Sequence, residues 1–434
     1  MKKAVLLFIL LFFNSCAKYN LVDFELSNGL KVICIEKKTA PVIFFSIWYK
    51  CGSKCDAPSK SGVAHYLEHM AFVSDEMEFS NILEDVGAEK NAFTALNAIC
   101  FHETIPKDHI ETVFFHEAKR MVRLHIEDQV FQSEKSAILE ERAMRIDNNP
   151  DGELQECETA NIFNRKVGGI GIIGWRHEIE SLTKEDLYKF HEKWFAPNNA
   201  VVIISGDFDL KKIKTLAEKY FGKIPPKKIV AVPKKAPPSF CFKEIKYASS
   251  KNRGTFATEY VYRLPNSFGK NLRKSIALNI AVNVLNHPAS FVEKILKDIF
   301  NYATISFSYI NGIFPYDLIS ATVTSSSIDA LRNSEKIWHY LKSRLLSTGI
   351  SKSEADAEKR RQLISLAYRR DDIIEMSNYF GWLLMAGYSP EEIQSTDDMV
   401  QSISEKECND VLKEALSREP TFISKSLPKG YDSE

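Results

Sequence analysis

Residues 61–72, SGVAHYLEHMAF, constrain this chain more than any other stretch. On a helix, His65, Glu68 and His69 occupy positions i, i+3 and i+4, so their side chains lie along one face. Two imidazoles one turn apart can hold one metal ion, and the carboxylate between them can reach a water on that ion. The ordinary alternative is a solvated helix face. With 10 histidines in 434 residues, chance gives this pattern in roughly one such chain in a hundred, so we predict a metal site.

A second helix, residues 133–145 (SEKSAILEERAMR), carries the carboxylates that such a site needs. Glu134 and Glu141 are seven residues apart and share a face, whereas Glu140 points about 120° away from Glu134. A zinc ion held by two histidines needs one more protein ligand, commonly a carboxylate, and keeps a position for water. We therefore predict Glu141 as the third ligand, with Glu134 behind it to orient the ligands and balance charge. Taken alone, either glutamate would be an ordinary surface residue.

Length and composition indicate a folded protein with at least two domains. Lysine plus arginine and aspartate plus glutamate balance at 57 each, and 44% of the residues are apolar. This balance argues against a dedicated nucleic-acid binder, so we expect no nucleic-acid partner. The eight cysteines are too few for a disulfide framework in a chain of this length. Cys51 and Cys55 could pair in an oxidising compartment. Lone buried thiols are an alternative of at least equal weight for Cys34, Cys100, Cys157, Cys241 and Cys408.

The first 17 residues, MKKAVLLFILLFFNSCA, have the pattern of an export signal peptide. Two lysines precede ten apolar residues, which is too short a run to span a bilayer comfortably. Two modes of processing stay open. Ser15-Cys16 fits a bacterial lipoprotein signal with Cys16 lipidated, and Ser15 with Ala17 fits ordinary signal peptidase. We expect an exported protein, either periplasmic or anchored to a membrane only through a lipidated Cys16.

Beyond residue 20, strand and helix patterns alternate, which predicts an α+β protein. Five prolines and five lysines in residues 223–240 indicate a stiff, exposed connection. We therefore expect an N-terminal domain over residues 20–225, a linker over 226–240 and a second domain over 241–434. In the second domain, residues 304–310 and 318–324 read as strands and 271–285 as a buried helix.

Four stretches of the chain carry a family resemblance. They are SGVAHYLEHMAF, GAEKNAFTALNA, KSAILEERAM and WRHEIESLTKEDLYKFHEKWFAPNNAVVIISGDFDLKKIKTLAEKYFGKIP. Together they resemble the insulinase, pitrilysin and mitochondrial processing peptidase family of zinc peptidases, whose H-x-x-E-H motif inverts the commoner H-E-x-x-H order. The resemblance covers residues 21–225 and is weaker beyond them, and the length is that of a short, bacterial-type, two-domain member. It implies two homologous halves, each a mostly antiparallel sheet packed with helices.

The family pattern also implies the roles of individual residues. Its zinc ligands are the two motif histidines and a glutamate some 70 to 80 residues further on, and these fall on His65, His69 and Glu141. The glutamate seven residues before that ligand falls on Glu134. The resemblance implies one Zn²⁺ per chain and a zinc-dependent endopeptidase in which Glu68 takes a proton from the bound water.

Peptides or unfolded segments in extended form are the substrates that the resemblance implies. In the family such a substrate adds as a strand to a sheet edge. The corresponding stretch is residues 90–98, with Asn91, Ala92, Phe93 and Thr94 as the expected substrate contacts. An ordinary strand is the alternative for these residues.

One family feature has no counterpart in this chain. Active family members usually supply, from a C-terminal half, an arginine and a tyrosine in a segment like L-R-x-x-x-G-L-A-Y-S, which hold the substrate backbone and the developing oxyanion. Here the segment corresponds to residues 294–309, and no arginine occurs between Arg273 and Arg332. We therefore expect the chain to be the metal-bearing subunit of a heterodimer whose homologous partner supplies that pair.

Two alternatives to the heterodimer remain. Tyr302 or Tyr309 could act as the donor through a shifted register, which would leave a self-sufficient enzyme. The chain could also be a non-catalytic, partner-binding subunit, but such subunits typically lose the metal motif, which is complete here.

Overall fold

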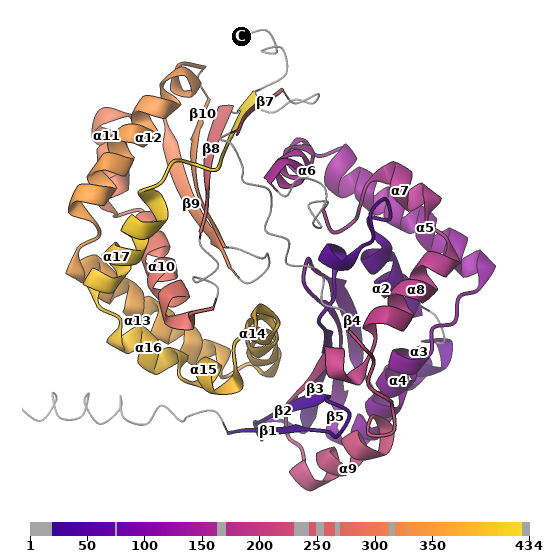
Figure 1. Cartoon of the computed structure of the whole chain (residues 1–434). Helices are drawn as coiled ribbons and strands as arrows, with labels where there is room; N and C mark the ends of the chain where they lie inside the picture. Colours follow the sequence, from indigo (N-terminus) through magenta and orange to yellow (C-terminus); the bar gives the residue numbers. More distant parts are fainter. Residues whose placement is uncertain are drawn as a thin grey trace, which may run out of the picture.

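The computed structural model describes residues 20–73, 76–162, 171–229, 243–248, 256–264, 270–311, 317–326 and 328–427. The expected signal peptide and most of the expected linker lie outside these residues. Figure 1 shows two halves, each a sheet with helices, that face each other. Within the described ranges, no helix combines the length and the apolar character needed to span a bilayer.

The sheet of the first half has six strands in the order β1-β2-β6-β3-β5-β4. Only the β2–β6 pair is parallel. The strands are β1 (Leu21–Glu25), β2 (Lys31–Glu36), β3 (Val42–Tyr49), β4 (Glu89–Thr94), β5 (Ile99–Pro106) and β6 (Ala200–Gly206). Strand β4 therefore lies at an edge of the sheet. Strands β4 and β5 form a hairpin, because the Ala95 N–H donates to the Ala98 carbonyl at 2.7 Å and closes a turn.

The second half repeats this topology with five strands in the order β7-β11-β8-β10-β9. These are β7 (Lys243–Ala248), β8 (Phe256–Arg263), β9 (Thr304–Ile310), β10 (Leu318–Ser325) and β11 (Phe422–Leu427). The β7–β11 pair is parallel and the others are antiparallel, as in the corresponding β2–β6 pair and its neighbours. The predicted α+β fold, with two matching and mostly antiparallel halves, is confirmed.

In each half, helices of that half cover one face of its sheet (Figure 1). Those of the first half are η1 (Ser53–Cys55), α2 (Val63–Val73), α3 (Glu76–Asp85), η2 (Lys107–His109), α4 (Ile110–Val122), α5 (Asp128–Arg142), η3 (Ala143–Asp147), α6 (Pro150–Ile162), α7 (Arg176–Ser181), α8 (Lys184–Trp194), η4 (Pro197–Asn199) and α9 (Leu210–Tyr220). Those of the second half are α10 (Leu272–Leu285), α11 (Phe291–Ile299), α12 (Ile328–Thr348), α13 (Lys352–Arg369), α14 (Ile373–Ala386), α15 (Pro390–Gln394), α16 (Thr396–Ser402) and α17 (Glu405–Leu416).

The first sheet is buried on both faces, and each half supplies one cover. Along β3, Phe45, Ile47 and Tyr49 belong to the core beneath the helices of the first half. Trp48 points to the opposite face and joins the core of the second half. Helix α14 lies on that face, against β3 and β6. The two halves therefore share a core. This shared core holds in place the surfaces of the two halves that face each other.

Candidate metal centre

The start of α2 is tightly held, and this fixes the face that carries the motif. Asp56 accepts hydrogen bonds from the backbone N–H groups of Gly62 and Ala64 at 2.8 and 3.1 Å, so it caps the first turn. Gly62 has φ +85°, and a Cβ there would lie 2.2 Å from the Ile173 carbonyl oxygen. On the other face of the helix, side chains such as Leu67 are fully buried. The helix can therefore present its polar face in only one direction.

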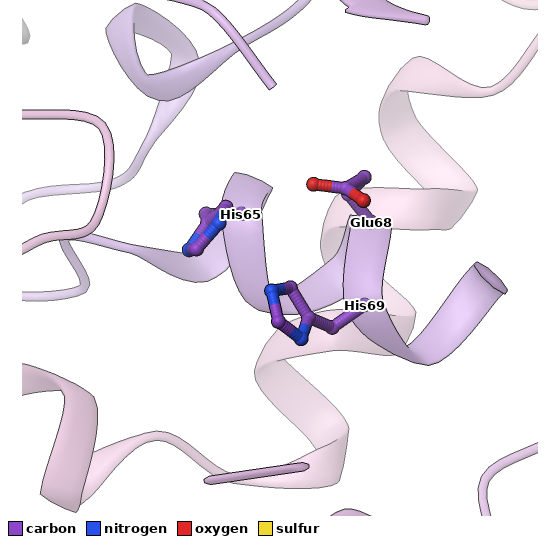
Figure 2. A group of neighbouring side chains, drawn as sticks. All are labelled: His65, Glu68 and His69. Carbon is purple, nitrogen blue, oxygen red and sulfur yellow. The ribbon is translucent and has the colours of Figure 1, made fainter. Parts of the chain in front are cut away.

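His65, Glu68 and His69 lie together on this face, with potential ligand atoms within 4.8 Å of one another (Figure 2). Helix α5 brings Glu141 to them: its Oε2 lies 3.6 Å from His65 Nε2 and 3.7 Å from His69 Nε2. These separations are too long for good hydrogen bonds. They approach the ~3.4 Å expected between two atoms that each lie about 2.1 Å from a tetrahedral zinc ion. The donor set of two imidazoles and one carboxylate fits zinc.

Glu134 and Thr94 each contact one of the motif residues. Glu134 Oε2 lies 3.0 Å from His69 Nδ1, so this carboxylate can hold the ring with Nε2 directed to Glu141. Ile138, between the two glutamates on α5, is fully buried and anchors that helix. The Thr94 hydroxyl donates to Glu68 Oε2 at 3.3 Å. Strand β4 is thus connected directly to the motif helix.

Burial and neighbouring charges give the two histidines opposite protonation behaviour. Burial, helped by the neighbouring His69, lowers the pKa of His65 to about 4, so this imidazole is neutral at physiological pH. Burial also lowers the pKa of His69, but the carboxylates of Glu141 and Glu134 outweigh it and raise that pKa to about 9. Burial raises the pKa of Glu68 to about 7. A carboxyl group with a pKa near neutrality is suited to general acid–base chemistry.

A cavity of about 870 Å³ opens in front of these residues. All nine residues predicted from the sequence line it: His65, Glu68, His69, Asn91, Ala92, Phe93, Thr94, Glu134 and Glu141. The second half lines it too, through the β-strand residues Glu259, Val261, Ser308, Ile310, Leu318 and Ser320. The cavity therefore lies between the halves, with the candidate metal centre on the first.

Sequence reasoning missed Arg145, the acidic residues of α6 and this second wall. Arg145 stands in the quoted stretch four residues after Glu141, and that spacing on a helix was a usable signal. No local pattern marks Glu259 or Ser320, because they reach the cavity only through the arrangement of the two halves.

Neither tyrosine considered as a replacement donor reaches the cavity. The Tyr309 hydroxyl hydrogen-bonds to Asp317 at 2.8 Å and Ser275 at 3.0 Å. Its neighbours Ser308 and Ile310 line the cavity, so by strand alternation Tyr309 points away. Tyr302 is not among the described residues that line the cavity. The shifted-register alternative thus finds no support in this conformation.

Two family models match the chain. The model "Insulinase (Peptidase family M16)" matches residues 31–171, and "Peptidase M16 inactive domain" matches residues 181–362. The chain belongs to the insulinase family. The resemblance drawn from the four sequence stretches is thereby confirmed, and the family model that matches the first half covers the candidate metal ligands His65, His69 and Glu141.

Members of the insulinase family resemble the chain in sequence and in structure. The "Zinc protease PqqE" of Helicobacter pylori is 32% identical over 204 residues, 45% of this chain and 45% of that protein. The chain thus spans a little under half of the length of this curated relative. A protease from Helicobacter pylori has the same fold, with a TM-score of 0.82 at 21% identity over 94% of this chain and 100% of that one. An M16 inactive domain from Pseudomonas fluorescens has a TM-score of 0.78 at 14% identity over 94% and 98%.

Proposed function

We propose that the chain is a zinc-dependent endopeptidase that cleaves peptides or unfolded segments. The observation that carries this proposal is the approach of His65 Nε2 and His69 Nε2 to one oxygen of Glu141, at separations suited to a shared ion. Relatives named as zinc proteases support it. When bound, zinc would lower the pKa of a coordinated water and polarise the scissile carbonyl.

Glu68 is the proposed general base. It lies beside both imidazoles, and its pKa of about 7 lets it accept a proton near neutral pH. The hydrogen bond from Thr94 leaves one carboxylate oxygen of Glu68 for the attacking water. Glu134 keeps the His69 ring oriented while that proton moves.

The free edge of β4 is the proposed substrate contact. Among the described residues, β4 pairs only with β5, so its other edge can accept an extended peptide. Asn91, Ala92, Phe93 and Thr94 all line the cavity. The Ala92 N–H donates to the side-chain oxygen of Asn91 at 2.8 Å, and an added strand would take over this donor.

The test is metal removal and return. Purified protein should carry one zinc, lose hydrolysis of an unstructured peptide after chelation, and regain it with one equivalent of zinc. Hydrolysis that survives complete removal of the metal would contradict the proposal.

We further propose that full activity needs a homologous partner subunit. The second half has no arginine between Arg273 and Arg332, and Tyr309 is hydrogen-bonded away from the cavity. Loss of one oxyanion donor costs roughly 10²–10³ in rate. The chain alone should therefore bind zinc normally and cleave feebly, and co-expression with a homologue that carries the pair should restore turnover. Robust turnover by the isolated chain would rule out the heterodimer.

Export is also proposed, from the apolar run and Cys16. Intact-mass analysis of membrane and soluble fractions should find a mature protein that begins at or near Cys16. An unprocessed Met1 in the cytosol would refute export, and a start at Lys18 would refute only the lipid.

A further inference from the structure

Arg145 occupies an unusual turn of backbone next to the metal centre. Helix α5 ends at Arg142, and residues Ala143–Asp147 continue as a π-helix, with the Asn148 N–H donating to the Ala143 carbonyl at 2.8 Å. In an α-helix, residue 145 would lie about 40° past Glu141 around the axis. The wider π turn reduces that offset. Single π turns occur frequently at functional sites.

The Arg145 guanidinium contacts the oxygen of Glu141 that faces away from the imidazoles. Its Nη1 lies 3.0 Å from Glu141 Oε1. The other oxygen, Oε2, is the one that lies 3.6 and 3.7 Å from His65 and His69. The two oxygens of this carboxylate therefore have separate partners.

The charged residues that line the cavity leave Arg145 as the partner of Glu141. Among the described residues that line the cavity, Arg145 is the only arginine or lysine. The lining carboxylates are Glu68, Glu134, Glu141, Glu156, Glu158 and Glu259. Glu156 is already bound by both terminal nitrogens of Arg142, at 2.7 and 2.8 Å. Of the described residues that line the cavity, Arg145 is thus the only one with a permanently positively charged side chain beside Glu141.

A carboxylate ligand can bind a metal through one oxygen or through both. A catalytic zinc site needs three protein ligand atoms and an open position for water. If both oxygens of Glu141 turned to the ion, the second would take the place that water requires. We infer that Arg145 is a positioning residue that holds Glu141 Oε1 away from the ion and so keeps this position open. The inference rests on the proposed zinc site.

The side chain of Arg145 is 67% exposed, so its ion pair adds little to folding stability. Replacement by methionine should therefore leave the melting temperature of the metal-free protein unchanged. Any change in metal binding or activity of this variant would therefore not be due to unfolding.

The test uses cobalt-substituted protein, because the visible absorption of Co²⁺ is strong in four-coordinate sites and weak at higher coordination. We expect Arg145→Met to weaken this absorption several-fold. Its kcat should fall about 10- to 100-fold, the usual cost of losing a partner of a metal ligand, with KM unchanged. Arg145→Lys should restore part of both, since an ammonium can still hold one oxygen.

The matched control is Arg176→Met. Arg176 binds Asp147 Oδ2 of the same π segment at 2.5 Å, is 46% exposed, and does not line the cavity. Its replacement should change neither the absorption nor kcat.

The outcomes separate this inference from the proposed function. An unchanged cobalt spectrum in Arg145→Met, or a change confined to KM, would overturn the inference while leaving the zinc peptidase intact. If the unsubstituted protein bound neither zinc nor cobalt, the proposed function would fail and the inference with it.

Discussion

Helices α2 and α10 occupy equivalent places in the two halves and have opposite characters. Each is the first α-helix after a central strand of its sheet, β3 or β8. Helix α2 packs against the edge strand β4 and against α8, and α10 packs against the edge strand β9 and against α17. Helix α2 brings His65, Glu68 and His69 to the cavity. Helix α10 instead buries residues such as Leu278, Ile280 and Ala281 completely. The comparison shows that this fold accepts a polar helix face where the helix lines a cavity. Where the equivalent helix is buried in the core, its side chains are apolar.

The largest effect that should distinguish the two helices is on catalysis. Glu68→Gln should lower peptide hydrolysis by at least ~10²–10⁴-fold, because it removes the proton acceptor, while one zinc per chain is retained. Zinc analysis and single-turnover assays would measure both. Full activity, or loss of the metal, in this variant would contradict the proposed role of Glu68 as general base.

A substitution in α10, the equivalent helix of the second half, should affect folding stability alone. Leu278 is fully buried in α10, so Leu278→Ala should destabilise the protein by ~2–5 kcal/mol by opening a cavity in the core. Zinc affinity measured at a temperature where the variant is folded should not change. If zinc were lost from the folded variant, the two helices would not be functionally separate.

The packing between the halves can be tested at Gly381 of α14. A Cβ there would lie 2.3 Å from atoms of the fully buried Trp48 ring. Gly381→Ala should therefore destabilise the protein by ~1–3 kcal/mol, even though alanine favours a helix. Denaturant unfolding would measure this. A stabilised variant would show that α14 can move off the first sheet.

Zinc binding should also depend on pH. With a pKa of about 9, His69 keeps a proton in the metal-free protein, and this proton must leave before Nε2 can bind zinc. His65, with a pKa of about 4, is already neutral. The apparent dissociation constant should therefore fall about tenfold for each unit of pH increase from 6 to 9. Chelator competition at several pH values would reveal a flat profile if His69 were neutral throughout.

Local spacing made much of the candidate metal centre predictable. The placement of His65, Glu68 and His69 follows from the helical repeat, and the seven-residue interval brings Glu134 and Glu141 to one face. The π turn was not predictable, because Ala143 and Met144 favour an α-helix and nothing local opposes one. The second-half lining of the cavity, which includes Glu259 and Ser320, depends on how residues far apart in the sequence are brought together. The periodicity of the sequence does not predict such contacts.

The position of α14 on the first sheet affects what would happen if the first half were produced alone. A polypeptide that stopped at residue 229 would contain every proposed zinc ligand, yet Trp48 and its neighbours on that face would meet water. Such a patch promotes association with other chains. The smallest stable unit that carries the candidate metal centre is therefore longer than the segment that encodes its residues, and we expect a polypeptide truncated at residue 229 to aggregate.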